Sequence, residues 1–77
     1  MKVDIISPDK LIYEGEADSI KLPGKDGSFG ILNNHAPIIA SLRAGTVVLK
    51  NNDNEQSFEV NGGVVEVVKN KVIILAD

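Results

Sequence analysis

Short runs of β-branched residues, separated by turn-forming residues, constrain the fold of this 77-residue chain more than any other feature. Nine Val and nine Ile stand against six Leu, and β-branched side chains fit a pleated strand better than a helix. Turn chemistry interrupts the apolar runs at intervals of roughly eight to twelve residues, which is typical of a sandwich or barrel. No segment has the pattern of a three-turn helix. The sequence therefore predicts an all-β fold.

The turn-forming residues between the apolar runs set the bounds of the expected strands. The first strand covers Lys2–Ile6 and ends at Ser7-Pro8-Asp9. Further strands are expected at residues 10–13, 17–22, 37–43, 46–50, 56–60, 64–68 and 72–75. Turns or bulges are expected at residues 14–16, 44–45, 51–54, 61–63 and 70–71. We therefore expect one domain over residues 1–77, a sandwich or barrel of short, mostly antiparallel strands.

Composition excludes several classes of function. The chain has no Cys, so it can form neither a disulfide nor a thiolate metal site. Its net charge is −3 with both signs scattered, and its only aromatic residues are Tyr13, Phe29 and Phe58, so nucleic-acid binding is not expected. The longest apolar run, residues 72–76, is too short to span a bilayer, and no signal peptide is visible at the start. We expect no direct membrane insertion.

No group of residues predicts catalysis. His35 is the only imidazole, so a two-His metal site within one chain is impossible, and no Ser lies in a nucleophile-elbow sequence. A loop histidine that bonds backbone or faces solvent is the simpler interpretation of His35. Glu14 and Glu16 are expected to be solvated charges at a turn. We predict no catalytic residue, no metal ligand and no cofactor, although an enzyme of unknown type stays open.

A glycine-rich segment covers residues 22–37. Gly24, Gly27 and Gly30 do not give the dinucleotide-binding spacing, and Lys25 is not followed by Ser or Thr as a phosphate-binding lysine would be. Nucleotide binding is therefore not expected. Glycines permit positive φ and close strand approach, and Pro37 favours extended geometry before it. We predict one fixed, protruding polar loop that carries Lys25, Asp26, Ser28, Asn33, Asn34 and His35.

The residues 64–68 and 72–75 are apolar almost throughout. Strands of this kind are covered on both faces, either by a second sheet or, on one face, by a partner subunit. The sequence leaves both options open. On the residues alone, it predicts a binding or structural module and goes no further.

The stretch Gly27-x-x-Gly30-Ile31-Leu32-x-x-His35-Ala36-Pro37 closely resembles the signature of the epsilon subunit of F-type ATP synthases, called delta in mitochondria. Other stretches resemble that family in order along the chain: Val3-Asp4-Ile5-Ile6-Ser7-Pro8, Leu42-x-x-Gly45-x-Val47, Asn61-Gly62-Gly63-Val64-Val65-Glu66-Val67 and Val72-x-x-Leu75-Ala76-Asp77. The resemblance covers essentially the whole chain.

The resemblance implies a two-sheet β-sandwich that serves as a non-catalytic rotor subunit at the foot of the central stalk, between the gamma subunit and the c-ring. It would couple proton- or sodium-driven rotation to ATP synthesis. It would lie peripherally on the cytoplasmic face of a bacterial inner membrane, or the equivalent organellar face, held by other subunits. Family members usually continue into two C-terminal helices, whereas this sequence stops at Asp77, so the inhibitory and ATP-sensing roles are not carried over. Asn33 stands where many members have Pro.

The resemblance also assigns roles to residues. The expected ring-facing residues are Asp26, Ser28, Asn34 and His35, and the expected determinants of loop geometry are Gly24, Gly27, Gly30 and Pro37. The expected gamma-facing residues are Arg43, Val47, Val65 and Val67.

Two rival interpretations remain. A carrier domain of the biotinyl or lipoyl type would need a modified lysine at a hairpin tip, yet Lys50 precedes Asn51-Asn52-Asp53 and the sole Met is Met1. An oligonucleotide-binding barrel is opposed by the acidic balance and the scarcity of aromatic residues.

Overall fold

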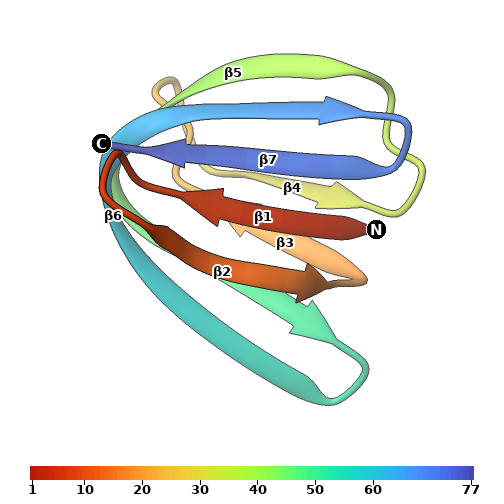
Figure 1. The fold of residues 1–77 in the computed structure, drawn as a ribbon. Coiled ribbons are helices and arrows are strands. Elements are labelled where there is room, and N and C mark those ends of the chain that lie inside the picture. Colours follow the sequence, from red (N-terminus) through yellow and green to blue (C-terminus); the bar gives the residue numbers. More distant parts are fainter.

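The computed structural model describes residues 1–77 as seven strands with no helix. The strands are β1 (Lys2–Ile6), β2 (Leu11–Glu16), β3 (Ser19–Leu22), β4 (Phe29–Leu32), β5 (Ile38–Asn51), β6 (Asn54–Val68) and β7 (Lys71–Ala76). Hydrogen bonds join them in the order β2-β1-β7-β6-β5-β3-β4, and this one sheet folds over into two layers (Figure 1). Only β1 and β7 pair in parallel. The all-β, mostly antiparallel expectation is confirmed.

The two layers are joined by strands that are long, not short. β5 has 14 residues and β6 has 15, and they pair along their whole lengths. The expected turn at Ala44-Gly45 and the expected break at residues 61–63 are therefore wrong: both strands continue and bend there (Figure 1). A sequence break looks the same whether the chain turns back or bends onward, because both use residues of low strand propensity.

Glycine makes the bend in β6. Gly62 and Gly63 have φ values of 132° and 141°, a region that side-chain-bearing residues avoid. A Cβ atom on Gly63 would also collide with the carbonyl oxygen of Leu75 on β7. The close approach of β6 to β7 at the bend therefore requires glycine at position 63.

The core lies between the two layers and contains 16 buried apolar residues. Its residues come from strands in which inward and outward side chains alternate. Val65 and Val67 of β6 face inward, as do Val72 and Ile74 of β7, while their chain neighbours face outward. Tyr13 of β2 and Phe58 of β6 close one side, with ring centroids 5.2 Å apart. No polar or charged side chain is buried in the core.

Two further boundaries differ from the expectation. Residues 14–16 belong to β2 and do not form a turn. β4 was expected to be part of a loop, because its four residues include a glycine and are flanked by turn-forming sequence. Its pairing with β3 makes it an edge strand.

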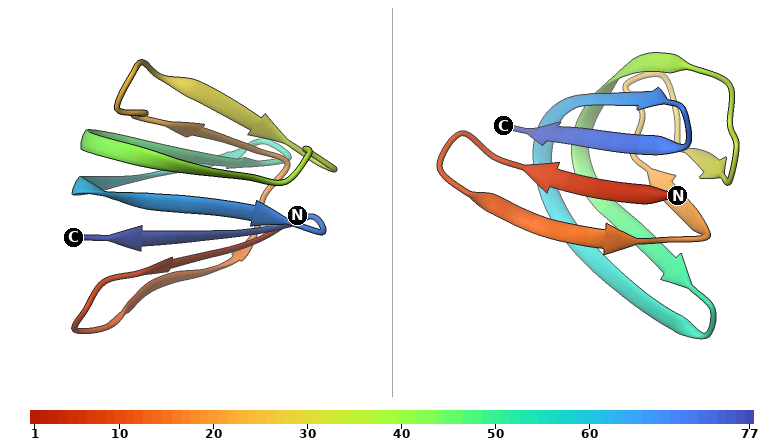
Figure 2. Two further views of the ribbon diagram at one scale, coloured as in Figure 1. Left: turned by 90° about the horizontal axis from the view of Figure 1, so that it is seen from above. Right: turned by 45° about the vertical axis from the view of Figure 1, so that its right-hand side comes forward.

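The connections gather at two opposite ends of the sandwich (Figure 2). One end, which we call the bend end, holds loop 23–28, the bends of β5 and β6, and Asp77. The other, the clasp end, holds Met1, loop 33–37 and the β6–β7 turn at Asn70. Since the chain has no helix, it has none that could cross a membrane.

Candidate docking surfaces

The glycine-rich segment forms two loops, and the expectation of a single loop is wrong. β4 lies between them, so Asp26 and Ser28 are at the bend end whereas Asn34 and His35 are at the clasp end (Figures 1 and 2). The four residues of β4 correspond to a separation of about 13 Å. The cause is Ile31, whose side chain is fully buried opposite Ile20 and draws the segment into the sheet.

Loop 23–28 is held through its backbone. The Arg43 N–H donates to Pro23 O at 2.9 Å, and the Lys25 N–H donates to Ser41 O at 2.9 Å. Gly24 is buried, and a Cβ there would collide with Gly27 O and the Phe29 ring.

The side chains of this loop are free. Asp26 and Ser28 are exposed, and the side-chain hydrogen bonds and ion pairs of the chain involve neither of them. Gly27 between them has φ 138°. Loop 23–28 is thus a fixed turn that presents unpaired polar groups to the outside.

Loop 33–37 is held through side chains. The Met1 ammonium donates to Asn33 Oδ1 at 2.7 Å, so the Asn33 side chain ties this loop to the N-terminus. The Asn34 N–H donates to Asn70 Oδ1 at 2.7 Å, and His35 Nδ1 lies 2.7 Å from Ala36 O. Half-buried His35 therefore contacts loop backbone, whereas the exposed Asn34 side chain forms no hydrogen bond within the chain.

The residues expected to face gamma occupy two kinds of position. Arg43 is exposed at the bend end, and its side chain is available to a partner. Val47, Val65 and Val67 have exposed fractions of 0%, 0% and 1%, and a covered side chain cannot contact a second subunit. For these three, the expected contact is corrected: they are core residues. Successive side chains of a strand point to opposite faces, so the outward-facing residues are the immediate neighbours of these valines in the strands.

The residues that alternate with the core valines form a continuous surface, which we call the outer apolar face. It consists of the exposed residues Leu11, Ile39, Val64, Val68 and Leu75. The strand register places them on the outer side of β2, β7, β6 and β5, with β1 between β2 and β7. Ile39 is 73% exposed and Leu75 51%. The alternation of side chains along a strand would predict this face from the sequence if it were known which alternate residues of β6 face the core.

Two hollows and two carboxylates complete the outer apolar face. One hollow of about 340 Å³ lies between Ile39 and Val68, and another of about 380 Å³ lies between Val64 and Leu75. Glu66 lies on the outer side between Val64 and Val68. Asp4 is on the same side, and its Oδ1 is covered without a hydrogen-bond donor. A contiguous apolar surface with polar residues among it is typical of a protein interface.

Other chemical arrangements are weak. No three His, Asp or Glu side chains are grouped so as to hold a metal ion. Glu14 forms an exposed ion pair with Lys2 at 3.5 Å. Lys50 lies within β5 opposite Glu55, and the hairpin tip is formed by Asn52 and Asp53, so the position that a carrier lysine would need holds no lysine.

Comparison with known proteins gives a consistent result. The sequence profile of the family described as ATP synthase, Delta/Epsilon chain, beta-sandwich domain matches residues 1–77. The ATP synthase epsilon chain of Leptospira interrogans is 44% identical over 77 residues, which are 100% of this chain and 61% of the relative. That of Chlorobium limicola is 46% identical over 77 residues, 99% of this chain and 88% of the relative. The chain thus spans about three fifths of the Leptospira protein and most of the Chlorobium one.

Solved structures share the fold. A chain of the Euglena gracilis mitochondrial ATP synthase, in a structure of OSCP, F1 and c-ring, superposes with a TM-score of 0.89 at 18% identity. The match covers 96% of this chain and 48% of that chain. A chain from the central stalk and c-ring of the Tetrahymena thermophila mitochondrial ATP synthase gives 0.80 at 20% identity, covering 97% and 61%.

Proposed function

Since the chain belongs to the family of ATP synthase delta and epsilon chain β-sandwich domains, we propose that it is a non-catalytic subunit of the central stalk. It joins gamma to the c-ring, so that ion-driven rotation of the ring reaches the catalytic head. The match of the family over the whole chain is the observation that carries this proposal. The subunit lies at the cytoplasmic face of the membrane, or its organellar equivalent, through contacts with other subunits.

The ring contact is assigned first to loop 23–28. A docking loop in a rotor transmits torque, so its backbone must hold its shape while its side chains stay available. Loop 23–28 meets both conditions, with two hydrogen bonds to β5 and with Asp26 and Ser28 unpaired. Asn34 and His35 form a second polar contact at the clasp end, in which the exposed Asn34 side chain is available and His35 is less so because its Nδ1 already contacts Ala36 O.

The gamma contact is assigned to the outer apolar face, with Arg43 at its border. Burial of exposed Ile39 and Leu75 would contribute the main favourable term, because association gains most from removing apolar surface from water. A rotating connection must not slip, and an extended face resists shear better than a single loop contact.

Rebinding to the synthase tests both assignments. ATP synthase would be purified from the source organism, stripped of this subunit, and titrated with the full-length protein carrying Asp26→Ala with Ser28→Ala, or Ile39→Asp with Leu75→Asp. Either double variant should weaken rebinding by about tenfold or more and lower proton-coupled ATP synthesis in vesicles.

The matched control is Ser57→Asp, an exposed substitution on β6 away from both surfaces, which should rebind like wild type. Failure of the wild-type protein to rebind stripped synthase would overturn the proposed function. Normal rebinding of the Asp26 and Ser28 variant would move the ring contact away from loop 23–28.

A further inference from the structure

Gly30 has no reason within the chain to be glycine. Gly27, Gly62 and Gly63 have positive φ, and Cβ atoms on Gly15, Gly24 and Gly45 would collide with neighbouring atoms. For Gly30 the φ is ordinary, and the nearest atom to an added Cβ is Ile20 O at 3.7 Å, an ordinary contact distance.

Glycine inside a strand lowers strand stability, and it marks a bulge, a bend or a place where another molecule approaches the backbone closely. The β3–β4 register is regular across Gly30, which excludes a bulge. β4 is only four residues long and has no bend of the kind seen in β6. Close approach from outside the chain is the remaining explanation.

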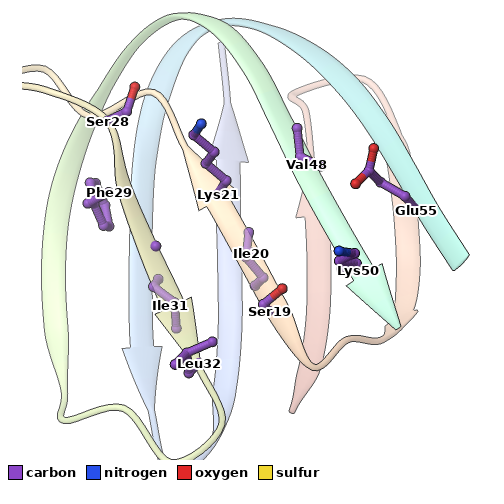
Figure 3. A pocket seen from close by; sticks show the side chains of 11 residues that line it. Ser19, Ile20, Lys21, Ser28, Phe29, Ile31, Leu32, Val48, Lys50 and Glu55 are labelled. Atoms are coloured by element: carbon purple, nitrogen blue, oxygen red, sulfur yellow. The ribbon is translucent and has the colours of Figure 1, made fainter. Parts of the chain in front are cut away.

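A hollow of about 450 Å³ lies over this position (Figure 3). Gly30 lies between Ser28 and Leu32 on the outer side of β4, and Leu32 is 66% exposed. Lys21, directly opposite Gly30 on β3, and Lys50 on β5 border the hollow, and neither forms an ion pair within the chain. The hollow therefore combines an apolar part with two free cations.

We propose that this hollow receives a polypeptide segment of another subunit, which places an apolar side chain against Gly30 and Leu32 and a carboxylate beside Lys21 or Lys50. Charge complementarity selects an acidic segment, because the lining of the hollow holds two lysines, Lys21 and Lys50, against a single carboxylate, Glu55. The segment lies next to loop 23–28, since Ser28 borders the same hollow. The contact itself follows from the hollow, and only the identity of the partner as a synthase subunit rests on the proposed function.

Photo-crosslinking in the intact complex tests this contact. Benzoylphenylalanine would replace Leu32 in the full-length subunit in its own cells, with the same residue at exposed Asp9, in the turn between β1 and β2, as the control outside the hollow. Irradiation should link position 32 to a segment that has an apolar residue with Asp or Glu beside it, identified by mass spectrometry of the crosslinked peptide. A yield at position 32 no higher than at position 9 would overturn the contact, and so would a linked segment without carboxylates.

A second substitution tests the role of Gly30. Gly30→Leu added to the crosslinking protein should lower the yield by about tenfold or more, because a side chain would fill the hollow. The melting temperature should not fall, and Gly30→Ala should keep or raise it, since the added Cβ has space. An undiminished crosslink in the Gly30→Leu protein would overturn the proposal.

The two proposals fail separately. If the subunit is absent from purified synthase but position 32 links to an acidic segment of another protein, the proposed function is wrong and the contact over Gly30 stands. If the subunit is present in the synthase and position 32 links to nothing, the proposed function stands and the contact is wrong.

Discussion

The bend end and the clasp end of the sandwich hold their loops by different physical means. At the bend end, main-chain hydrogen bonds and close glycine contacts fix loop 23–28, and its polar side chains remain unpaired. At the clasp end, Asn33, Asn70 and the Met1 ammonium fix loop 33–37 through side-chain bonds. A loop held by its backbone keeps its side chains for a partner. In loop 33–37 the side chains of Asn33 and His35 are used within the chain, and only the Asn34 side chain remains unpaired.

The largest effect should come from breaking the bend end. Gly63→Ala would force a Cβ into the carbonyl oxygen of Leu75 at a positive φ, and we expect a loss of about 3 kcal/mol or more in the free energy of unfolding. Urea denaturation followed by circular dichroism measures this. Gly30→Ala is the matched control and should be neutral or stabilising. Equal stability of the two variants would show that the bend relaxes easily.

At the clasp end, Asn70 combines a left-handed backbone with a side-chain bond. Its φ is 60°, and its Oδ1 accepts from the Asn34 N–H. Asn70→Ala should therefore cost about 2 kcal/mol, from a less favourable backbone together with an unpaired N–H. Asn70→Gly keeps the backbone conformation and should cost about 1 kcal/mol. If thermal denaturation showed no difference between them, the backbone conformation would not contribute at this site.

His35 should matter less. His35→Ala removes a half-buried ring that contacts Ala36 O, and the expected cost is about 1 kcal/mol. His35→Gln keeps a nitrogen donor and should recover part of the loss. Denaturant midpoints of the three proteins decide this, and an unchanged midpoint for His35→Ala would remove His35 from the clasp.

The smallest effect on stability should come from the side chains of loop 23–28. Asp26→Ala with Ser28→Ala removes exposed, unpaired groups, so the free energy of unfolding should change by no more than about 0.5 kcal/mol. The same denaturation measurement checks it. A loss of 1 kcal/mol or more would mean that these side chains support the fold, and the contrast between the two ends would then disappear.

Sequence patterns predicted the strands with regular alternation well. The first strand was placed at Lys2–Ile6, and the final hairpin of β6 and β7 was placed correctly. β4 was missed because four residues with a central glycine carry too little pattern to stand out from the surrounding turns. The long strands β5 and β6 were each divided in two, because their bends use Ala, Asn and Gly, the same residues that make turns.

The candidate site was predicted only in part. Asp26, Ser28, Asn34 and Arg43 were correctly placed on the surface, but two of the loop residues proved to lie at the other end of the sandwich. Val65 and Val67 were assigned outward when Val64 and Val68 face that way. In a strand that is apolar on nearly every residue, hydropathy does not distinguish the residues that face the core from those that face outward.

By itself, the sequence determined that the chain is all-β and has no thiolate chemistry, and it carried the resemblance to the epsilon family. β-Branched composition and motif spacing are local properties, and they can be read from the chain directly. The tertiary structure alone decided which valines are covered, where β5 and β6 bend, and which loop keeps free side chains. Those properties depend on pairing between residues far apart in sequence, such as Gly63 with Ala76 and Ile31 with Ile20, and a linear pattern does not contain that pairing.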